Sequence, residues 1–168
     1  MNSRIVPGGE LDLGQLPKQS GERHEALVDL FGRYIMWMRN WNNESTRRLV
    51  ESPEAREKLG AIFRKPFDET SQLTAVDREK AIRLAEASVD GFLKLLLQVL
   101  SHQGSDFLFG KDHALRLRLV MELVQKENDE LVEQEVINRG GQKHFSDYFG
   151  KWLNRFRDER TPVDGNKP

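Results

Sequence analysis

The chain has 168 residues, which fits one domain, because a single core of this size can bury roughly two-thirds of the surface that the unfolded chain exposes. Its 26 basic and 27 acidic side chains give a net charge of −1, which disfavours non-specific binding to polyanions or acidic membranes. The absence of cysteine excludes disulfides, thiolate nucleophiles and sulfur-ligated metal centres.

The ends of the chain differ in composition from its middle. Residues 1–20 mix glycine and proline with isolated aliphatic residues, so we expect a flexible arm there and a flexible tail over residues 161–168. Residues 21–160 are predicted to form a single globular domain. No segment approaches the roughly 20 apolar residues of a membrane helix, and Pro7-Gly8-Gly9 interrupts any signal-peptide pattern, so the sequence predicts a cytoplasmic protein.

The first helix is predicted from Glu22 to Asn42, because apolar side chains recur there with a period of 3.6 residues. The predicted apolar face consists of Leu27, Leu30, Phe31, Tyr34, Ile35, Met38 and Trp41, with Trp37 beside it. Two short helices are expected to follow. The second opens at Ser52-Pro53, where serine can accept a bond from a free amide and proline suits the first helical position, and it ends near Lys65-Pro66.

A long apolar helix is predicted over residues 74–103 as the centre of the fold. Thr74 and Asp77 resemble a capping box at its start, and Gly104 suits its end. Its second half, Phe92–Leu100, is apolar nearly all round, so we expect other elements to cover that half on all sides. The polar residues on this helix are interpreted as a solvated face with local ion pairs: Glu79, Arg83, Glu86 and Asp90.

The next segment predicts an antiparallel β-hairpin with strands at residues 114–124 and 131–138. Between Leu115 and Leu123 apolar residues occupy alternate positions, which is the period of a strand. A continuous helix would instead place Asn128, Glu135 and Asn138 in the core. Asparagine and aspartate in the turn tolerate positive φ, and the leucine face of the hairpin is expected to lie on the helices.

A final aromatic amphipathic helix completes the predicted fold. Its stripe has helical spacing and consists of Phe145, Tyr148, Phe149, Trp152, Leu153 and Phe156. The fold class is therefore predicted to be α+β and mostly helical, with about five helices packed around the central helix and one antiparallel hairpin.

The sequence contains no complete catalytic motif, so an enzyme is not favoured and no cofactor is expected. Gly110-Lys111 lacks the flanking residues of a phosphate-binding loop and is interpreted as a turn. One alternative function is a metal-dependent enzyme or regulator. Its ligands would come from the loop between the central helix and the hairpin: His102, Asp106, Asp112 and His113.

A second alternative is nucleic-acid binding through the basic region at residues 33–65. This region holds eight basic residues against four acidic ones, with Trp37 and Trp41 nearby. Basic residues interleaved with aromatic ones can bind a single strand. Both tryptophans, however, lie on the apolar side of their helix, so packing in the core is the favoured interpretation.

The leading hypothesis is a small protein-binding module of the kind that neutralises or regulates a partner protein, as immunity proteins and antitoxins do. Two groups of residues are candidates for the partner surface. Acidic residues on the hairpin could meet a basic partner: Asp129, Glu130, Glu133 and Glu135. Aromatic residues of the last helix are types that anchor interfaces: Tyr148, Trp152 and Phe156. A homo-oligomer is a further option.

Overall fold

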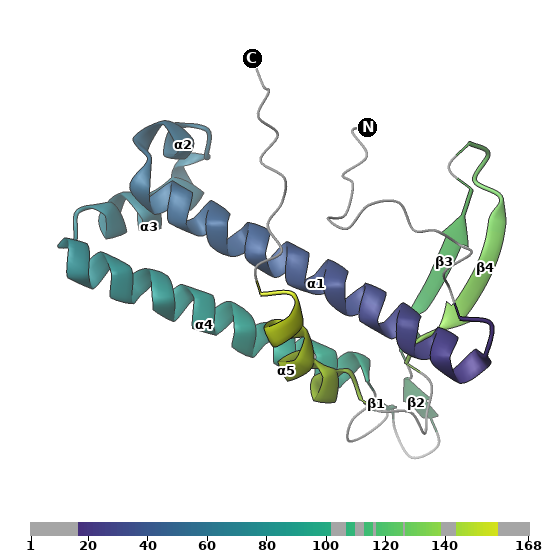
Figure 1. Ribbon diagram of the computed structural model, residues 1–168. Helices are drawn as coiled ribbons and strands as arrows, with labels where there is room; N and C mark the ends of the chain where they lie inside the picture. Colours follow the sequence, from purple (N-terminus) through teal and green to yellow (C-terminus); the bar gives the residue numbers. More distant parts are fainter. Residues whose placement is uncertain are drawn as a thin grey trace.

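The computed structural model describes residues 17–101, 107–109, 113–115, 117–125, 127–138 and 144–157 (Figure 1). The helices are α1 (Ser20–Glu51), α2 (Pro53–Glu57), α3 (Ala61–Ser71), α4 (Ala75–Leu100) and α5 (Phe145–Arg155). The strands are β1 (Phe107–Phe109), β2 (His113–Leu115), β3 (Val120–Val124) and β4 (Leu131–Val136). The predicted α+β, mostly helical class is confirmed.

Two long helices form the frame of the molecule. Figure 1 shows α1 and α4 side by side and running in opposite directions, with α5 near one end of the pair and α2 and α3 at the other. The first helix was expected to stop at Asn42, but it continues to Glu51. Tertiary contacts support the extension, because Val50 is buried and Arg47 forms ion pairs with α4.

Of the two short helices expected after the first helix, only the one opening at Ser52-Pro53 begins as predicted, since α1 occupies the place of the other. The hydroxyl of Ser52 accepts a bond of 3.1 Å from the amide of Ala55 and caps α2, with Pro53 at the first position. The expected end near Lys65-Pro66 is wrong, because α2 stops at Glu57 and Pro66 lies inside α3. Pro66 removes a single helical N–H in the second turn of α3, and the helix tolerates that loss.

The start of α4 is confirmed, whereas its expected burial is not. The hydroxyl of Thr74 accepts a bond of 3.2 Å from the amide of Asp77, as the capping pattern predicts. Only Ile82 and Leu97 of α4 are buried. The expectation that Phe92–Leu100 is covered on all sides is therefore wrong, because neighbouring elements cover one face of this half and leave the other in solvent.

The predicted hairpin is present as β3 and β4, but its first strand is divided. The segment expected to be continuous over residues 114–124 forms β2 up to Leu115 and β3 from Val120. β2 pairs with β1 in a second antiparallel hairpin, and β3 pairs with β4 from Val120↔Val136 to Val124↔Leu131. Asp129 in the turn has φ of 55°, in line with the expected positive φ.

Asn138 explains the division of the strand. Its amide group donates to the carbonyls of Leu100, at 2.6 Å, and Leu117, at 3.0 Å, and its oxygen accepts from the amide of Leu119 at 2.8 Å. The Asn138 side chain thus satisfies backbone groups between β2 and β3 that a continuous strand would pair with a neighbour. Asn138 is buried, but its polar atoms are bonded, so the expected cost of burying it does not arise.

The core lies where α5 packs on α1 and α4. It contains the apolar face of α5 together with residues from α1, α4 and the end of the hairpin: Leu27, Val28, Met36, Leu97, Ile137, Phe145, Tyr148, Phe149, Trp152 and Phe156. Leu119 and Met121 pack against this cluster, so part of the predicted leucine face lies on the core, whereas Leu117 is 36% exposed. Gly32 of α1 lets Trp152 approach closely, because a Cβ at position 32 would lie 2.0 Å from the Trp152 ring.

Candidate interaction surface

The acidic residues of the hairpin divide into two pairs. Glu133 forms an ion pair with Arg23, and an oxygen of Glu135 lies 3.1 Å from Nδ1 of His24. These two carboxylates therefore attach β4 to the first turns of α1. Asp129 and Glu130 lie at the exposed tip of the hairpin. Of the predicted acidic residues, this leaves the tip pair facing solvent.

The aromatic residues proposed from the sequence lie in the core. Tyr148, Trp152 and Phe156 are all buried. The Tyr148 hydroxyl donates to a carboxylate oxygen of Glu25 at 2.6 Å, and the Trp152 indole donates to Asp29 at 3.1 Å. Burial and the Glu25 carboxylate raise the pKa of Tyr148 well above its ordinary value. The aromatic stripe of α5 serves as the packing surface for α1.

The candidate metal loop falls largely outside the described residues. His102, Asp106 and Asp112 are not among them, and of His113 only the backbone of β2 is described. In the part of the chain that the structure describes, no group of three or more histidine, aspartate or glutamate side chains could hold a metal ion.

The basic region at residues 33–65 is engaged in internal ion pairs at several positions. Arg39 contacts Asp90 with an Nη2–Oδ2 distance of 2.9 Å, and Arg47 contacts Glu79 at 2.8 Å and Glu86 at 3.5 Å. Glu79, Glu86 and Asp90 therefore face α1, which corrects their interpretation as a solvated face, whereas the expected local pair of Glu79 with an exposed Arg83 is present. Bonds from Arg47 and Arg83 lower the pKa of Glu79 to about 2.

The two tryptophans of the basic region differ in burial. Trp37 is buried, as the core interpretation predicted, and it stacks on Tyr34 with ring centroids 5.9 Å apart. The same interpretation is wrong for Trp41, which is 44% exposed. Arg56 is also buried and donates to the carbonyls of Leu49 and Val50. Charges that are paired or buried in this way are poorly available to phosphate groups.

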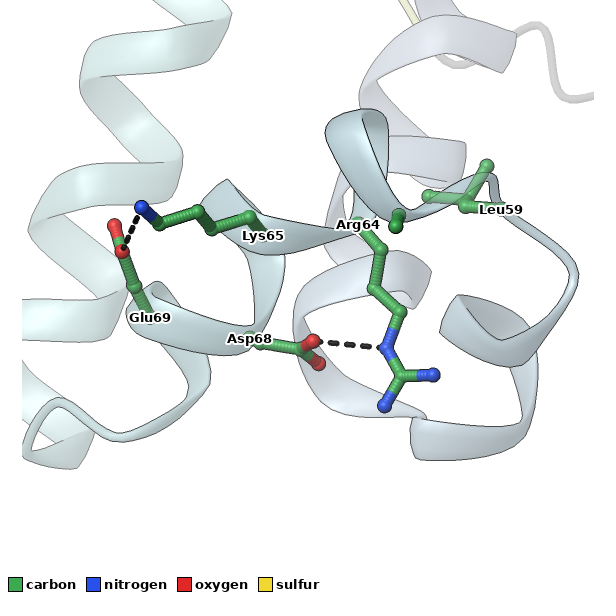
Figure 2. Close-up of a pocket in the computed structure, with 6 residues that line it drawn as sticks. Leu59, Arg64, Lys65, Asp68 and Glu69 are labelled. Carbon is green, nitrogen blue, oxygen red and sulfur yellow. Dashed lines mark hydrogen bonds and ion pairs between the residues drawn. The ribbon is translucent and has the colours of Figure 1, made fainter.

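Figure 2 shows a pocket at α3 that is lined mainly by charged side chains. Asp68 accepts from Arg64 at 2.8 Å, and the Lys65 ammonium lies 3.8 Å from Glu69, so the charges pair along one helix. A second contact of 2.9 Å joins Asp68 to Arg56 and ties α3 to α2. These pairs neutralise one another, and the pocket presents no uncompensated charge that would select a ligand.

The most distinctive surface feature is an apolar stripe on the side of α4 that faces away from α1. We define the apolar stripe by its large exposed residues and their exposed fractions: Leu84 70%, Phe92 65%, Leu95 62%, Leu96 36% and Val99 42%. Soluble proteins rarely expose contiguous apolar patches of more than a few hundred Å², and larger ones mark interaction sites. The stripe is therefore the strongest candidate for a functional surface.

The charged side chains of α4 lie away from the apolar stripe. The charged residues of α4 between positions 81 and 99 lie on its other faces: Arg83, Glu86, Asp90 and Lys94. Glu86 and Asp90 face the arginines of α1. The same ion pairs that fix α4 against α1 thus turn its second apolar face outward. The sequence signal was present, since the helix is apolar nearly all round, but it was interpreted as burial.

None of the described helices is long and apolar enough to cross a membrane. In comparisons with known proteins, no protein-family model, curated protein or solved structure matches the chain.

Proposed function

We propose that this chain is a protein-binding module and that the apolar stripe on α4 is its main binding surface. One observation carries the proposal: five large apolar side chains share one helix face, and each is between 36% and 70% exposed. Fully burying a side chain of this size contributes about 1.5–3 kcal/mol. A partner that covers the stripe would therefore gain a substantial part of its binding free energy there.

The acidic tip of the hairpin is proposed as a second contact, defined by Glu127, Asp129 and Glu130. All three residues are exposed, whereas Glu133 and Glu135 are engaged with α1. An acidic surface attracts a basic partner, which suits a neutralising or regulatory role of the kind that immunity proteins have. A cytoplasmic location belongs to the same proposal, because a cysteine-free chain suits a reducing compartment.

Site-specific photo-cross-linking tests the main surface. Benzoylphenylalanine is placed at Leu84 or at Leu95, in cells that produce the protein naturally, with Arg83 as the matched control. Arg83 lies on the same helix with a side chain 75% exposed, but outside the stripe. We expect discrete protein adducts from the two stripe positions and none from Arg83. The same adducts from all three positions, or none from the stripe, would refute the proposal.

The acidic tip has a separate test. Reversing both charges with Asp129→Lys and Glu130→Lys should weaken binding of the cross-linked partner at low salt, and the loss should shrink as salt rises. Glu122→Lys, an exposed position on β3, is the control. Unchanged affinity in the doubly reversed variant would remove the tip from the proposal and leave the stripe in place.

A further inference from the structure

The outward face of α4 has the spacing of a coiled-coil seam. Six residues follow one another at alternating steps of four and three positions: Ala81, Ala85, Ser88, Phe92, Leu95 and Val99. This alternation is the a/d repeat by which one helix packs along another. The seam is graded in size, because its first three residues are small and its last three are large.

The size gradient is self-complementary when two copies of α4 run in opposite directions. With a two-fold axis at the level of residue 90, each small residue lies opposite a large one. The facing pairs are Ala81 with Val99, Ala85 with Leu95, and Ser88 with Phe92. Leu84 and Leu96 flank the seam on its two edges and widen the apolar interface. A parallel pair would instead place Phe92 against Phe92 and leave small residues facing each other across a gap, which packs poorly.

Two further residues suit burial against another helix. The Ser88 hydroxyl donates to the carbonyl of Leu84 at 2.9 Å, so it carries no unpaired donor into an apolar interface. Gly91 lies in the middle of α4, where glycine costs about 1 kcal/mol relative to alanine. A Cβ at Gly91 would meet nothing within 4 Å among the described residues, so their packing does not explain this glycine. Next to the axis, Gly91 lets two backbones approach.

The area of the stripe is compatible with a dimer of moderate affinity. The exposed parts of its five large side chains amount to roughly 500 Å², against about 800 Å² per partner in a standard interface. The small residues of the seam and the adjoining backbone add to this area. We therefore expect a dissociation constant of about 1 μM rather than a permanent dimer.

We infer that the partner of the apolar stripe is a second copy of this chain, bound antiparallel through α4 with the two-fold axis at residue 90. The inference rests on the proposed function and identifies the partner that binds the apolar stripe. An isologous interface of this kind closes on itself and yields a dimer, not a filament.

Single-cysteine variants test both the identity of the partner and the register of the two α4 helices, because the chain has no cysteine of its own. Ala85→Cys chains mixed with Leu95→Cys chains should give a covalent dimer on mild oxidation, since these positions face each other across the axis. Either variant alone should not, because position 85 or 95 lies about 15 Å along the axis from its own copy, beyond the reach of a disulfide. A mixture of Ala81→Cys and Ala85→Cys, about 21 Å out of register, is the matched control.

Light scattering on the unmodified chain gives the second readout. We expect the dimer mass at about 100 μM, far above a micromolar dissociation constant, and the monomer mass for Phe92→Asp combined with Leu95→Asp, with unchanged helical circular dichroism. Cross-linking of either single-cysteine variant alone would overturn the antiparallel register. A monomer at this concentration, with no disulfide in the mixed sample, would overturn self-association.

The two proposals can fail separately. If the purified chain is monomeric while stripe positions cross-link to a different protein in cells, self-association is wrong and the protein-binding function stands. If the stripe yields no adduct in cells and no dimer in solution, both fall. Adducts with twice the mass of the chain support both.

Discussion

The two ends of the α1–α4 helix pair differ in how far their apolar side chains are buried. Around α5 the core is closed, and Trp152 is 0% exposed although it is the largest residue type in the chain. At the other end α3 has no buried residue, and its Ile62 and Phe63 are exposed. The same two helices, α1 and α4, connect both ends. The difference therefore arises from what packs on them, since α5 covers one end and nothing among the described residues covers α3 comparably.

The end at α2 and α3 has few buried apolar residues and is joined in part by ion pairs. Ion pairs of Arg47 with Glu79 and of Arg56 with Asp68 join α1 to α4 and α2 to α3. The Arg47–Glu79 pair is exposed, and exposed pairs contribute little to stability, about 0–1 kcal/mol each. Apolar content alone therefore does not make a core: the α5 end stabilises the fold, and the remaining apolar surface along α4 stays exposed.

The sharpest form of this comparison lies on α4 itself, between neighbouring leucines on opposite faces. Leu97→Ala should lower the free energy of unfolding by about 3 kcal/mol, because Leu97 is buried in the core. Leu95→Ala should change it by less than about 0.5 kcal/mol, because Leu95 faces solvent. Denaturant titration at concentrations where the chain is monomeric measures both. Equal losses would break the distinction between the two faces.

Gly32→Ala tests the closeness of packing at the α5 end. The alanine Cβ would lie 2.0 Å from the Trp152 ring, so α1 and α5 must separate. We expect the free energy of unfolding to fall by roughly 2–3 kcal/mol. Gly150→Ala is the control, because no described residue lies within 4 Å of a Cβ there and alanine favours the helix. A thermal melt of Gly32→Ala that matches the parent would contradict the Gly32–Trp152 contact.

Asn138→Ala tests whether one buried amide joins the hairpin to α4. The substitution removes the side-chain hydrogen bonds to the carbonyls of Leu100 and Leu117 and to the amide of Leu119. We expect the free energy of unfolding to fall by about 2 kcal/mol. Asn128→Ala removes a bond at the exposed hairpin tip and should cost less than about 1 kcal/mol. Hydrogen exchange of the Leu119 amide is the local readout, and unchanged protection would argue against the bridge.

Asp90→Asn tests the charge-based attachment of α4 to α1. The Arg39–Asp90 pair is partly exposed, so its loss should cost about 1 kcal/mol at low salt and less at high salt. Unfolding curves at two ionic strengths measure the effect. A cost that does not depend on salt would show that Asp90 contributes by packing and not by charge.

The smallest effect is expected for Asp29→Asn, through pH. Burial disfavours ionised Asp29, but bonds from Lys151 and Trp152 outweigh it and hold the pKa of Asp29 below its ordinary value of 3.8. The ionised form is thus favoured in the folded state, and its contribution is present above pH 3.8 and lost as pH falls through the lower folded pKa. At neutral pH the free energy of unfolding of the parent should exceed that of the variant by less than about 1 kcal/mol. The two free energies should converge in acid.

Local sequence signals determined where several elements begin and turn. Thr74 with Asp77, and Ser52 with Pro53, predicted the starts of α4 and α2, because a cap depends on residues within one turn. The alternation from Leu115 to Leu123 and the asparagine and aspartate of the turn predicted the hairpin. Boundaries that depend on distant contacts, such as the extension of α1 to Glu51, were not predictable in this way.

The candidate surface was visible in the sequence only in part. The exposed Asp129 and Glu130 were named from composition, whereas the engagement of Glu133 by Arg23 depends on α1 lying beside β4. A glycine inside a helix signals close approach, but only the position of Trp152 says what approaches Gly32.

Tertiary structure alone decided which face of α4 is covered. The sequence makes the half from Phe92 to Leu100 apolar nearly all round, and it does not say how many neighbours are present to cover it. In the fold, the arginines Arg39 and Arg47 draw the charged face of α4 toward α1. The rest of the fold covers Leu97 and leaves Phe92 and Leu95 in solvent. Burial is a property of the packed assembly of elements, and for this reason an apolar helix predicted as scaffold became the candidate binding surface.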